Sequence, residues 1–259
     1  MTIDLPARFG GAPALAVPAL LGAGVLAQIC YPLVTGAARD TLTVLAVVLI
    51  AAAALFHAAA TRGSPVVLAV FAVTAVGGFA VELLGVHTGV PFGRYEYEDS
   101  LGASVWRVPL LIAFAWTMLA WPAALAARRL ARTFLARVAL GAWALATWDV
   151  FLDPQMVAAG HWHWSDPAPH LPGVPDVPLS DYGGWLAVAA LMSFALQKIL
   201  DTAPGTHDDR WPLWFYVWTW ASSSLALAAF LGLGPAAVWG FIAMGTVAVP
   251  LARSLAGSR

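Results

Sequence analysis

The chain has 259 residues, of which 61% are hydrophobic and only 10% are charged, and its formal net charge is −1. An average soluble domain carries roughly 25% charged residues, so this composition indicates an integral membrane protein. The apolar segments reach the roughly 20 residues that a membrane-spanning helix needs, and they are too long and continuous for a membrane β-barrel. A nearly neutral chain has no electrostatic basis for binding nucleic acid. We therefore predict an all-α, polytopic transmembrane protein.

Eight apolar segments predict a bundle of about eight transmembrane helices. The segments are, in chain order, residues 13–31, 41–60, 66–85, 108–127, 134–151, 184–200, 212–231 and 235–251. No internal repeat or low-complexity linker divides them, so we expect one integral membrane domain over residues 1–259. The lone cysteine, Cys30, lies in the first segment and cannot form a disulfide within the chain.

The distribution of basic residues predicts the orientation of the bundle. Loops rich in Lys and Arg stay in the cytoplasm. With eight spans, 10 of the 13 basic residues fall on one side, and only Arg39, Arg94 and Arg107 fall on the other. We therefore expect a multi-pass protein of the cell membrane with both termini in the cytoplasm. The same assignment brings residues 82–107 and 149–184 together at the outer end of the bundle.

Residues 79–97, FAVELLGVHTGVPFGRYEY, form the point where a very apolar sequence turns polar. Glu82 lies near the end of the third apolar segment, where a buried charge costs roughly several kcal/mol unless it is paired or neutralised. His87, Arg94 and Glu96 follow among glycines that let the backbone fold back against the helices. An ionisable group at membrane depth predicts a functional site. The alternative is an ordinary surface loop with solvated charges.

A second group of acids ends the fifth apolar segment, in the sequence TWDVFLDPQM at 147–156. Asp149 and Asp153 are four residues apart, so their carboxyl groups share one face if the helix continues through Leu152. Two acids placed in this way resist double ionisation, and the proton that they retain is what a general acid needs. The alternative is that Asp153 ends the helix before Pro154 and Asp149 makes a buried hydrogen bond.

His161 and His163 alternate with Trp162 and Trp164. Two imidazoles are too few for a metal centre unless Glu82 and the two aspartates complete it, so we expect no metal. The sequence contains no cysteine pair, glycine-rich phosphate loop or nucleophilic serine motif. We therefore expect no cofactor.

The chain has 13 tryptophans, and several of them are too far from the membrane surface to be interfacial anchors. Those near the middle of a predicted span are Trp116, Trp143, Trp218 and Trp220. Such rings either line a groove for a long apolar ligand or pack between helices, and both interpretations remain open. Serines 222–224 allow close helix contact or a polar water site within the seventh span.

Three segments resemble one known family. They are VELLGVHTGVPFGRYEY at 81–97, WDVFLDPQMVAAGHWHW at 148–164 and GVPDVPLSDYGGW at 173–185. Together they are similar to the CruF-type carotenoid biosynthesis membrane proteins, the family of carotenoid 1,2-hydratases and bisanhydrobacterioruberin hydratase. From the resemblance we expect an asparagine and a phenylalanine before the final Gly-Trp, where this chain has Asp181 and Tyr182. The resemblance implies cofactor-free addition of water to a terminal double bond of an acyclic carotenoid.

Hydration of such an alkene needs a proton for the less substituted carbon, a pocket for the tertiary cation and a positioned water. From residue chemistry we expect Asp149 to donate the proton and Asp153 to hold it in place. Glu82 or His87 would orient the water. The side chains expected to contact the substrate are Arg94, Tyr95, Tyr97, Trp148, Trp162, Trp164, Asp181 and Trp185, with Trp148 and Tyr95 facing the cation.

Two other functions fit the same features. A membrane terpene or carotenoid cyclase starts with the same protonation but quenches the cation with an internal alkene, so its product is an isomer. A lipid-binding, isoprenoid-binding or transport protein would use the acids as a proton relay. The expected partners are an acyclic carotenoid or related long isoprenoid, the lipid bilayer and other enzymes of carotenoid synthesis.

Overall fold

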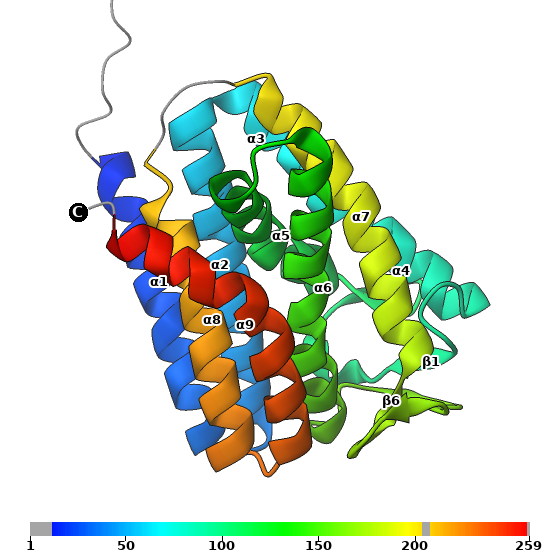
Figure 1. The fold of residues 1–259 in the computed structure, drawn as a ribbon. Coiled ribbons are helices and arrows are strands. Elements are labelled where there is room, and N and C mark those ends of the chain that lie inside the picture. Colours follow the sequence, from blue (N-terminus) through cyan, green and yellow to red (C-terminus); the bar gives the residue numbers. More distant parts are fainter. Residues whose placement is uncertain (1–11, 204–207, 258–259) are drawn as a thin grey trace, which may run out of the picture.

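The computed structural model describes residues 12–203 and 208–257, and this part of the chain forms a bundle of eight long helices (Figure 1). They are α1 (Ala12–Cys30), α2 (Ala37–Arg62), a continuous helix of α3 (Ser64–Phe71), a π-helical turn (Ala72–Val76) and α4 (Gly77–Thr88), then α5 (Leu111–Leu130), α6 (Phe134–Ala158), α7 (Leu179–Asp201), α8 (Arg210–Ala229) and α9 (Gly234–Ala256). Arg8 and Arg259, which belong to the count of basic residues, lie outside the described residues.

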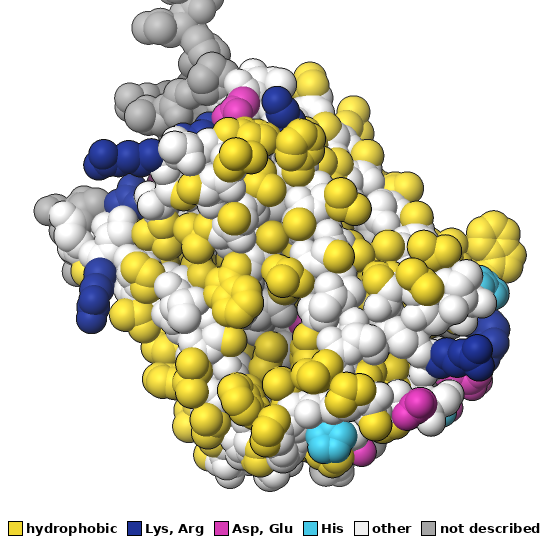
Figure 2. All heavy atoms as spheres, turned by 45° about the vertical axis from the view of Figure 1, so that its right-hand side comes forward, with side chains coloured by type: hydrophobic (Ala, Val, Ile, Leu, Met, Phe, Trp, Pro, Cys, Tyr) yellow, Lys and Arg dark blue, Asp and Glu magenta, His cyan; other side chains and the backbone are white. Residues whose placement is uncertain are grey.

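Seven of these helices, all except α8, are long and apolar enough to cross a membrane. Four tryptophans and serines 222–224 reduce the hydropathy of α8, although it has 20 residues and packs against α9 and α5. On the face shown in Figure 2, hydrophobic side chains cover the middle and charged side chains gather toward the ends. The predicted class, a polytopic helical membrane protein, is confirmed.

Helix α6 extends beyond the segment that hydropathy predicts. It begins after Thr133, whose side chain accepts a hydrogen bond from the amide of Ala136 at 3.3 Å, as an N-cap residue does. It then continues through Pro154 to Ala158. The alternative in which Asp153 ends the helix is therefore wrong, and Asp149 lies one turn from Asp153 on the same helix.

Helix α5 occupies the centre of the bundle. It contacts α2, α6, α7, α8 and α9 as well as the π-helical turn, and most of its residues are buried. Small alanine side chains in its second half let the neighbouring helices approach closely. The hydroxyl groups of Thr117 and Thr74 lie 2.8 Å apart and join α5 to the π-helical turn.

Three small two-stranded sheets, which the sequence analysis did not predict, lie at one end of the bundle. They pair β1 (Tyr95–Tyr97) with β4 (Trp162–Trp164), β2 (Ser104–Val105) with β3 (Val108–Pro109), and β5 (His170–Leu171) with β6 (Val174–Pro178). Helix α1 begins and α9 ends at the opposite end of the bundle (Figure 1). The sheets therefore gather the polar segments 82–107 and 149–184 at one end.

Candidate functional site

A cavity of about 150 Å³ lies inside the half of the bundle that the sheets cover. Its wall includes Glu82 from α4, Asp153 from α6 and Asp181 from α7. Aromatic rings form much of the remaining surface near these acids, and those that line the cavity are Tyr95, Tyr97, Trp116, Trp148, Trp162, Trp164 and Trp185. The cavity therefore combines an apolar, ring-lined interior with three buried carboxyl groups.

Glu82 is buried, and both of its carboxyl oxygens accept hydrogen bonds. Oε2 accepts from the hydroxyl groups of Tyr95 at 2.6 Å and Tyr97 at 2.8 Å. Oε1 accepts from the indole nitrogen of Trp116 at 3.0 Å. The two tyrosines come from strand β1 and the tryptophan comes from helix α5. Glu82 is therefore a carboxyl group whose acceptor positions are occupied by three neutral donors.

Two glycines of the same helix make room for these donors. A Cβ atom at Gly78 would lie 2.5 Å from the Trp116 ring, and a Cβ atom at Gly85 would lie 2.7 Å from the hydroxyl oxygen of Tyr95. Both distances are shorter than van der Waals contact. Glycine at these positions therefore lets the indole and the phenol reach Glu82.

The pairing of β1 with β4 fixes the two tyrosines. Tyr95 lies opposite Trp164 and Tyr97 lies opposite Trp162, and the ring centroids of these pairs are 5.8 Å and 5.5 Å apart. Burial, followed by the nearby charge of Glu82, raises the pKa of both Tyr95 and Tyr97 above the ordinary value of 10.0. Both phenols therefore stay protonated and remain donors to Glu82 at neutral pH.

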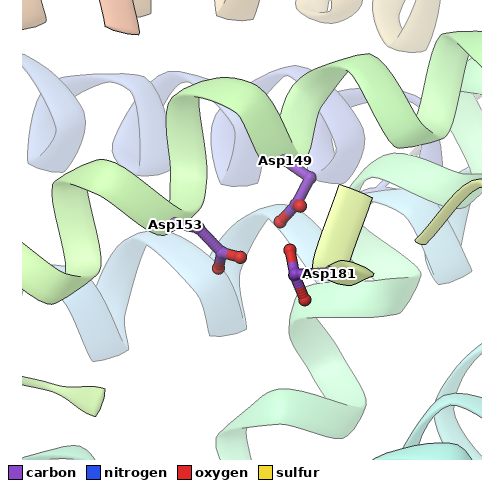
Figure 3. Close-up of side chains that lie close together, drawn as sticks. All are labelled: Asp149, Asp153 and Asp181. Carbon is purple, nitrogen blue, oxygen red and sulfur yellow. The ribbon is translucent and has the colours of Figure 1, made fainter. Parts of the chain in front are cut away.

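Asp149, Asp153 and Asp181 form a second group of acids, which we call the aspartate cluster (Figure 3). Their carboxyl groups point toward one another, and one oxygen from each lies within 4.8 Å of the others. All three side chains are buried. Within the described part of the chain, no donor group reaches either oxygen of Asp149 or one oxygen each of Asp153 and Asp181. Among the described residues, no Lys, Arg or His forms an ion pair with any of them.

Three carboxylates packed together without a cation are unstable, because their charges repel one another and have lost their hydration. Shared protons remove this cost, and so does a hard cation such as Mg²⁺ or Ca²⁺, which prefers oxygen ligands. The residues that could hold a cation are therefore the three aspartates. Neither histidine of the segment 161–163 belongs to the cluster.

Three tryptophans line the cavity around these acids. The rings of Trp116 and Trp185 stack, with centroids 4.0 Å apart and an angle of 15° between their planes. Trp148 meets Trp185 edge to face at 6.1 Å. The faces of such rings attract a positive charge. This part of the cavity can therefore accept either an apolar chain or a cationic centre.

The structure brings together many of the residues that the sequence predicts for a site, and it separates others. Glu82, Asp153 and Asp181 line the cavity with the predicted tyrosines and tryptophans. Asp149 belongs to the aspartate cluster but is not part of the cavity wall. The side chains of His87 and Arg94 are exposed and do not line the cavity.

His161, by contrast, is fully buried beside the β1–β4 sheet. Its Nδ1 atom lies 2.7 Å from the hydroxyl group of Ser100, in the 3₁₀ turn Asp99–Leu101, and its Nε2 atom lies 3.9 Å from a carboxyl oxygen of Asp40 in α2. Burial lowers the pKa of His161, although the charge of Asp40 acts in the opposite direction. His161 therefore joins the sheet to α2 as a neutral side chain.

Sequence reasoning missed two functional contacts. Asp181 was expected to contact the substrate, and its membership of the aspartate cluster was not predicted. Trp116 was expected either to line a groove or to pack between helices, and it also donates a hydrogen bond to Glu82. The signal that could have found the first is an aspartate, Asp181, at the start of an apolar segment.

Comparisons with known proteins point to one family. A family model described as "Carotenoid biosynthesis protein" matches residues 41–248. A bisanhydrobacterioruberin hydratase from Haloarcula japonica is 30% identical over 183 residues, which cover 62% of this chain and 57% of that protein. The chain thus spans little more than half the length of the curated relative. No solved structure matches it.

Proposed function

Because the chain belongs to the family of carotenoid biosynthesis proteins, we propose that it is an enzyme that hydrates the terminal C=C bond of an acyclic carotenoid end group. The product is a tertiary alcohol. The observation that carries this proposal is a set of buried carboxyl groups, without basic partners, at the wall of a cavity lined by tryptophans. The name of the archaeal relative supports the same chemistry.

We assign the transferable proton to Asp153. Asp153 and Asp181 both face the cavity, whereas Asp149 does not. Asp181 lies in the first turn of α7, where the positive end of the helix dipole stabilises a carboxylate. Asp153 lies in the last two turns of α6 and has no such stabilisation. Asp149 then acts behind the other two as the residue that shares the proton, which reverses the roles expected from the sequence.

The proposed reaction balances without an oxidant or reductant. Asp153 gives its proton to the less substituted alkene carbon, and the π electrons of the double bond form the new C–H bond. The other alkene carbon becomes a tertiary cation. A water oxygen donates a lone pair to this carbon, and the proton that the oxygen then loses returns to the aspartate cluster. This cycle needs no cofactor.

In this proposal Glu82 stabilises the cationic intermediate and does not donate the proton. With three donors on its two oxygens, Glu82 is held as an acceptor and keeps a negative charge near the cavity. Trp116 and Trp185 offer their stacked rings beside it. A cation–π contact contributes about 0.5 to 2 kcal/mol. The fixed charge and the rings together lower the free energy of the cationic intermediate.

The arrangement also supports the predicted orientation. We propose that both termini are cytoplasmic and that the sheets and the cavity lie at the outer end of one membrane domain. The bias of basic residues supports this orientation. Reporter fusions after Arg132 and after Pro172 test it, because they should give opposite readings, and identical readings would contradict the number of spans.

Expression in cells that accumulate lycopene tests the reaction itself. The pigment should gain the mass of one or two water molecules, and the new hydroxyl groups should be tertiary. Pigment from cells with an empty vector is the control. A product of unchanged mass would instead establish the cyclase, and unchanged lycopene in cells that contain the folded protein would contradict the proposal.

A further inference from the structure

The cavity has a second polar region, on the side of α1 and α8, that the proposed reaction does not use. Gln28 from α1, Thr43 from α2, and Thr219, Ser222 and Ser223 from α8 line this side. The acids come from α4, α6 and α7, whereas these polar side chains come from α1, α2 and α8. One cavity thus has carboxyl groups on one side and hydroxyl and amide groups on the other.

The amide group of Gln28 is held in one orientation. The indole nitrogen of Trp218 donates a hydrogen bond to its oxygen at 2.9 Å. An indole N–H only donates, so the amide oxygen must face Trp218 and the amide nitrogen must point elsewhere. No described residue accepts a hydrogen bond from that nitrogen. Gln28 therefore offers the cavity an amide with two free donor positions.

The hydroxyl groups of α8 divide into engaged and free ones. Thr219 donates to the carbonyl oxygen of Phe215 at 3.0 Å, and Ser224 donates to that of Trp220 at 2.7 Å. Ser222 makes only a long contact of 3.5 Å with the carbonyl oxygen of Thr219. Ser223 lines the cavity and has no hydrogen-bond partner among the described residues. Ser223 is therefore a second free donor beside the cavity.

Gln28 and Ser223 are half-buried, and each lines the cavity with a donor that no described residue accepts. Such a donor beside an apolar wall gains a hydrogen bond when an acceptor binds. The neighbouring wall is apolar and includes Leu42, Ala46 and Val47. A ligand oxygen in this part of the cavity would supply the acceptor that Gln28 and Ser223 lack. Close helix packing does not account for these side chains, because they line open space.

We propose that Gln28 and Ser223 form an oxygen-binding subsite, in which both side chains donate hydrogen bonds to one oxygen atom of the reacting system. This oxygen belongs either to the water that is added or to a hydroxyl or keto group that the carotenoid already carries. The proposal extends the proposed function, since it places the oxygen recognition of the hydratase on the α1–α8 side. The acid side supplies the proton.

Two variants and one matched control test the subsite. Gln28→Leu and Ser223→Ala each remove one free donor, whereas Ser224→Ala removes a neighbouring hydroxyl group that does not line the cavity. Two pigments are compared, an acyclic hydrocarbon carotenoid and an acyclic carotenoid with a hydroxyl group. Affinity is measured by quenching of tryptophan fluorescence in detergent, and turnover by pigment mass.

If the oxygen belongs to the pigment, Gln28→Leu and Ser223→Ala should weaken binding of the hydroxylated pigment by about tenfold and leave the hydrocarbon unaffected. If it belongs to water, both pigments should bind normally and turnover of both should fall by about tenfold. Ser224→Ala should change nothing. Trp218→Phe removes the hydrogen bond that orients the Gln28 amide. It should change the same quantity, affinity or turnover, by a smaller factor.

The subsite is wrong if Gln28→Leu and Ser223→Ala match the wild type in affinity for both pigments and in turnover. Failure of the proposed function gives a different result. In that case the wild type binds pigment without hydrating it, and the affinity comparison alone then decides whether the subsite exists.

Discussion

Two groups of acids face the same cavity and are held in opposite ways. Glu82 accepts hydrogen bonds from Tyr95, Tyr97 and Trp116, so both of its oxygens are engaged. In the aspartate cluster, four carboxyl oxygens accept no hydrogen bond from any donor group of the described residues. In the proposed function, the first arrangement holds a charge in place and the second exchanges protons. The comparison teaches that burial alone does not identify a proton donor, because the surrounding donors decide which role a buried acid can have.

Asp153→Asn should have the largest effect, because it removes the proposed acid but keeps the size of the side chain. Turnover per folded molecule should fall by about 10²- to 10⁴-fold, the usual contribution of general acid catalysis. Size-exclusion chromatography in detergent and a pigment assay measure it. Asp181→Asn is the matched control and should cost less, since the proposed donor Asp153 stays in place. Near-native turnover of Asp153→Asn, with loss in Asp149→Asn, would restore Asp149 as the donor.

Glu82→Gln should rank second, and it would sharpen the difference between the two groups of acids. An amide presents N–H groups to at least one of the three donors, so turnover should fall by roughly tenfold or more and the protein should lose stability. Tyr97→Phe removes only one donor and should lose less on both measurements. An unchanged pH profile in Glu82→Gln would support a fixed charge, whereas a shifted acidic limb would show that Glu82 supplies the proton.

Gly85→Ala should disturb the Glu82 site without touching the aspartate cluster. The added methyl group meets the hydroxyl oxygen of Tyr95, and overpacking of this kind costs roughly 1 to 3 kcal/mol of unfolding free energy. Thermal unfolding in detergent measures the change. Gly183→Ala is the control, because nothing lies within 4 Å of the added atom. Equal melting temperatures for the two variants would contradict the tight approach of Tyr95.

A smaller, pH-dependent effect should come from His161, which secures the sheet that carries two of the Glu82 donors. Its pKa is lowered from 6.5 by burial, so as the pH falls below about 6.5 the unfolded chain binds the proton before the folded chain does. Stability is therefore complete above this pH and declines as the pH decreases further. His161→Asn should reduce the fall in melting temperature over this pH range. His163→Asn changes the exposed neighbouring histidine and should leave that fall unaltered.

Chelation should have the smallest effect of all. If protons rather than a cation hold the aspartate cluster together, turnover after treatment with EDTA should equal that of the untreated protein. Loss of turnover that Mg²⁺, Ca²⁺ or Mn²⁺ restores would instead show that the cluster is a metal site. The aspartates would then differ from Glu82 by binding a cation, and not by transferring a proton.

Hydropathy was enough to predict the helices, because each must bury or present about 20 apolar residues to lipid. The prediction of one shared face for Asp149 and Asp153 was also correct, since it depends only on helical spacing. The end of α6 was less accurate. Pro154 favours a helix end in isolation, but the packed helix continues beyond it.

Contacts between different segments of the chain could not be predicted from local sequence patterns. The donors of Glu82 reach it across a strand pair and a helix packing that no local pattern encodes. The three sheets have strands of two to five residues, which are too short to show an alternating pattern. His87 looked equivalent to the buried His161 by composition, yet it ends exposed, because helix α4 turns that face outward.

The pairing of β1 with β4 has a consequence for how the protein is made. Tyr95 and Tyr97 leave the ribosome roughly 70 residues before the tryptophans that they pair with. At about 5 to 20 residues per second, several seconds pass in which the tyrosines that donate to Glu82 have no strand partner to fix them. Helices α5 and α6 must insert before the sheet can close. The nascent chain therefore carries a loosely held acid through much of its insertion, and this interval is where a membrane insertase or chaperone would have most to protect.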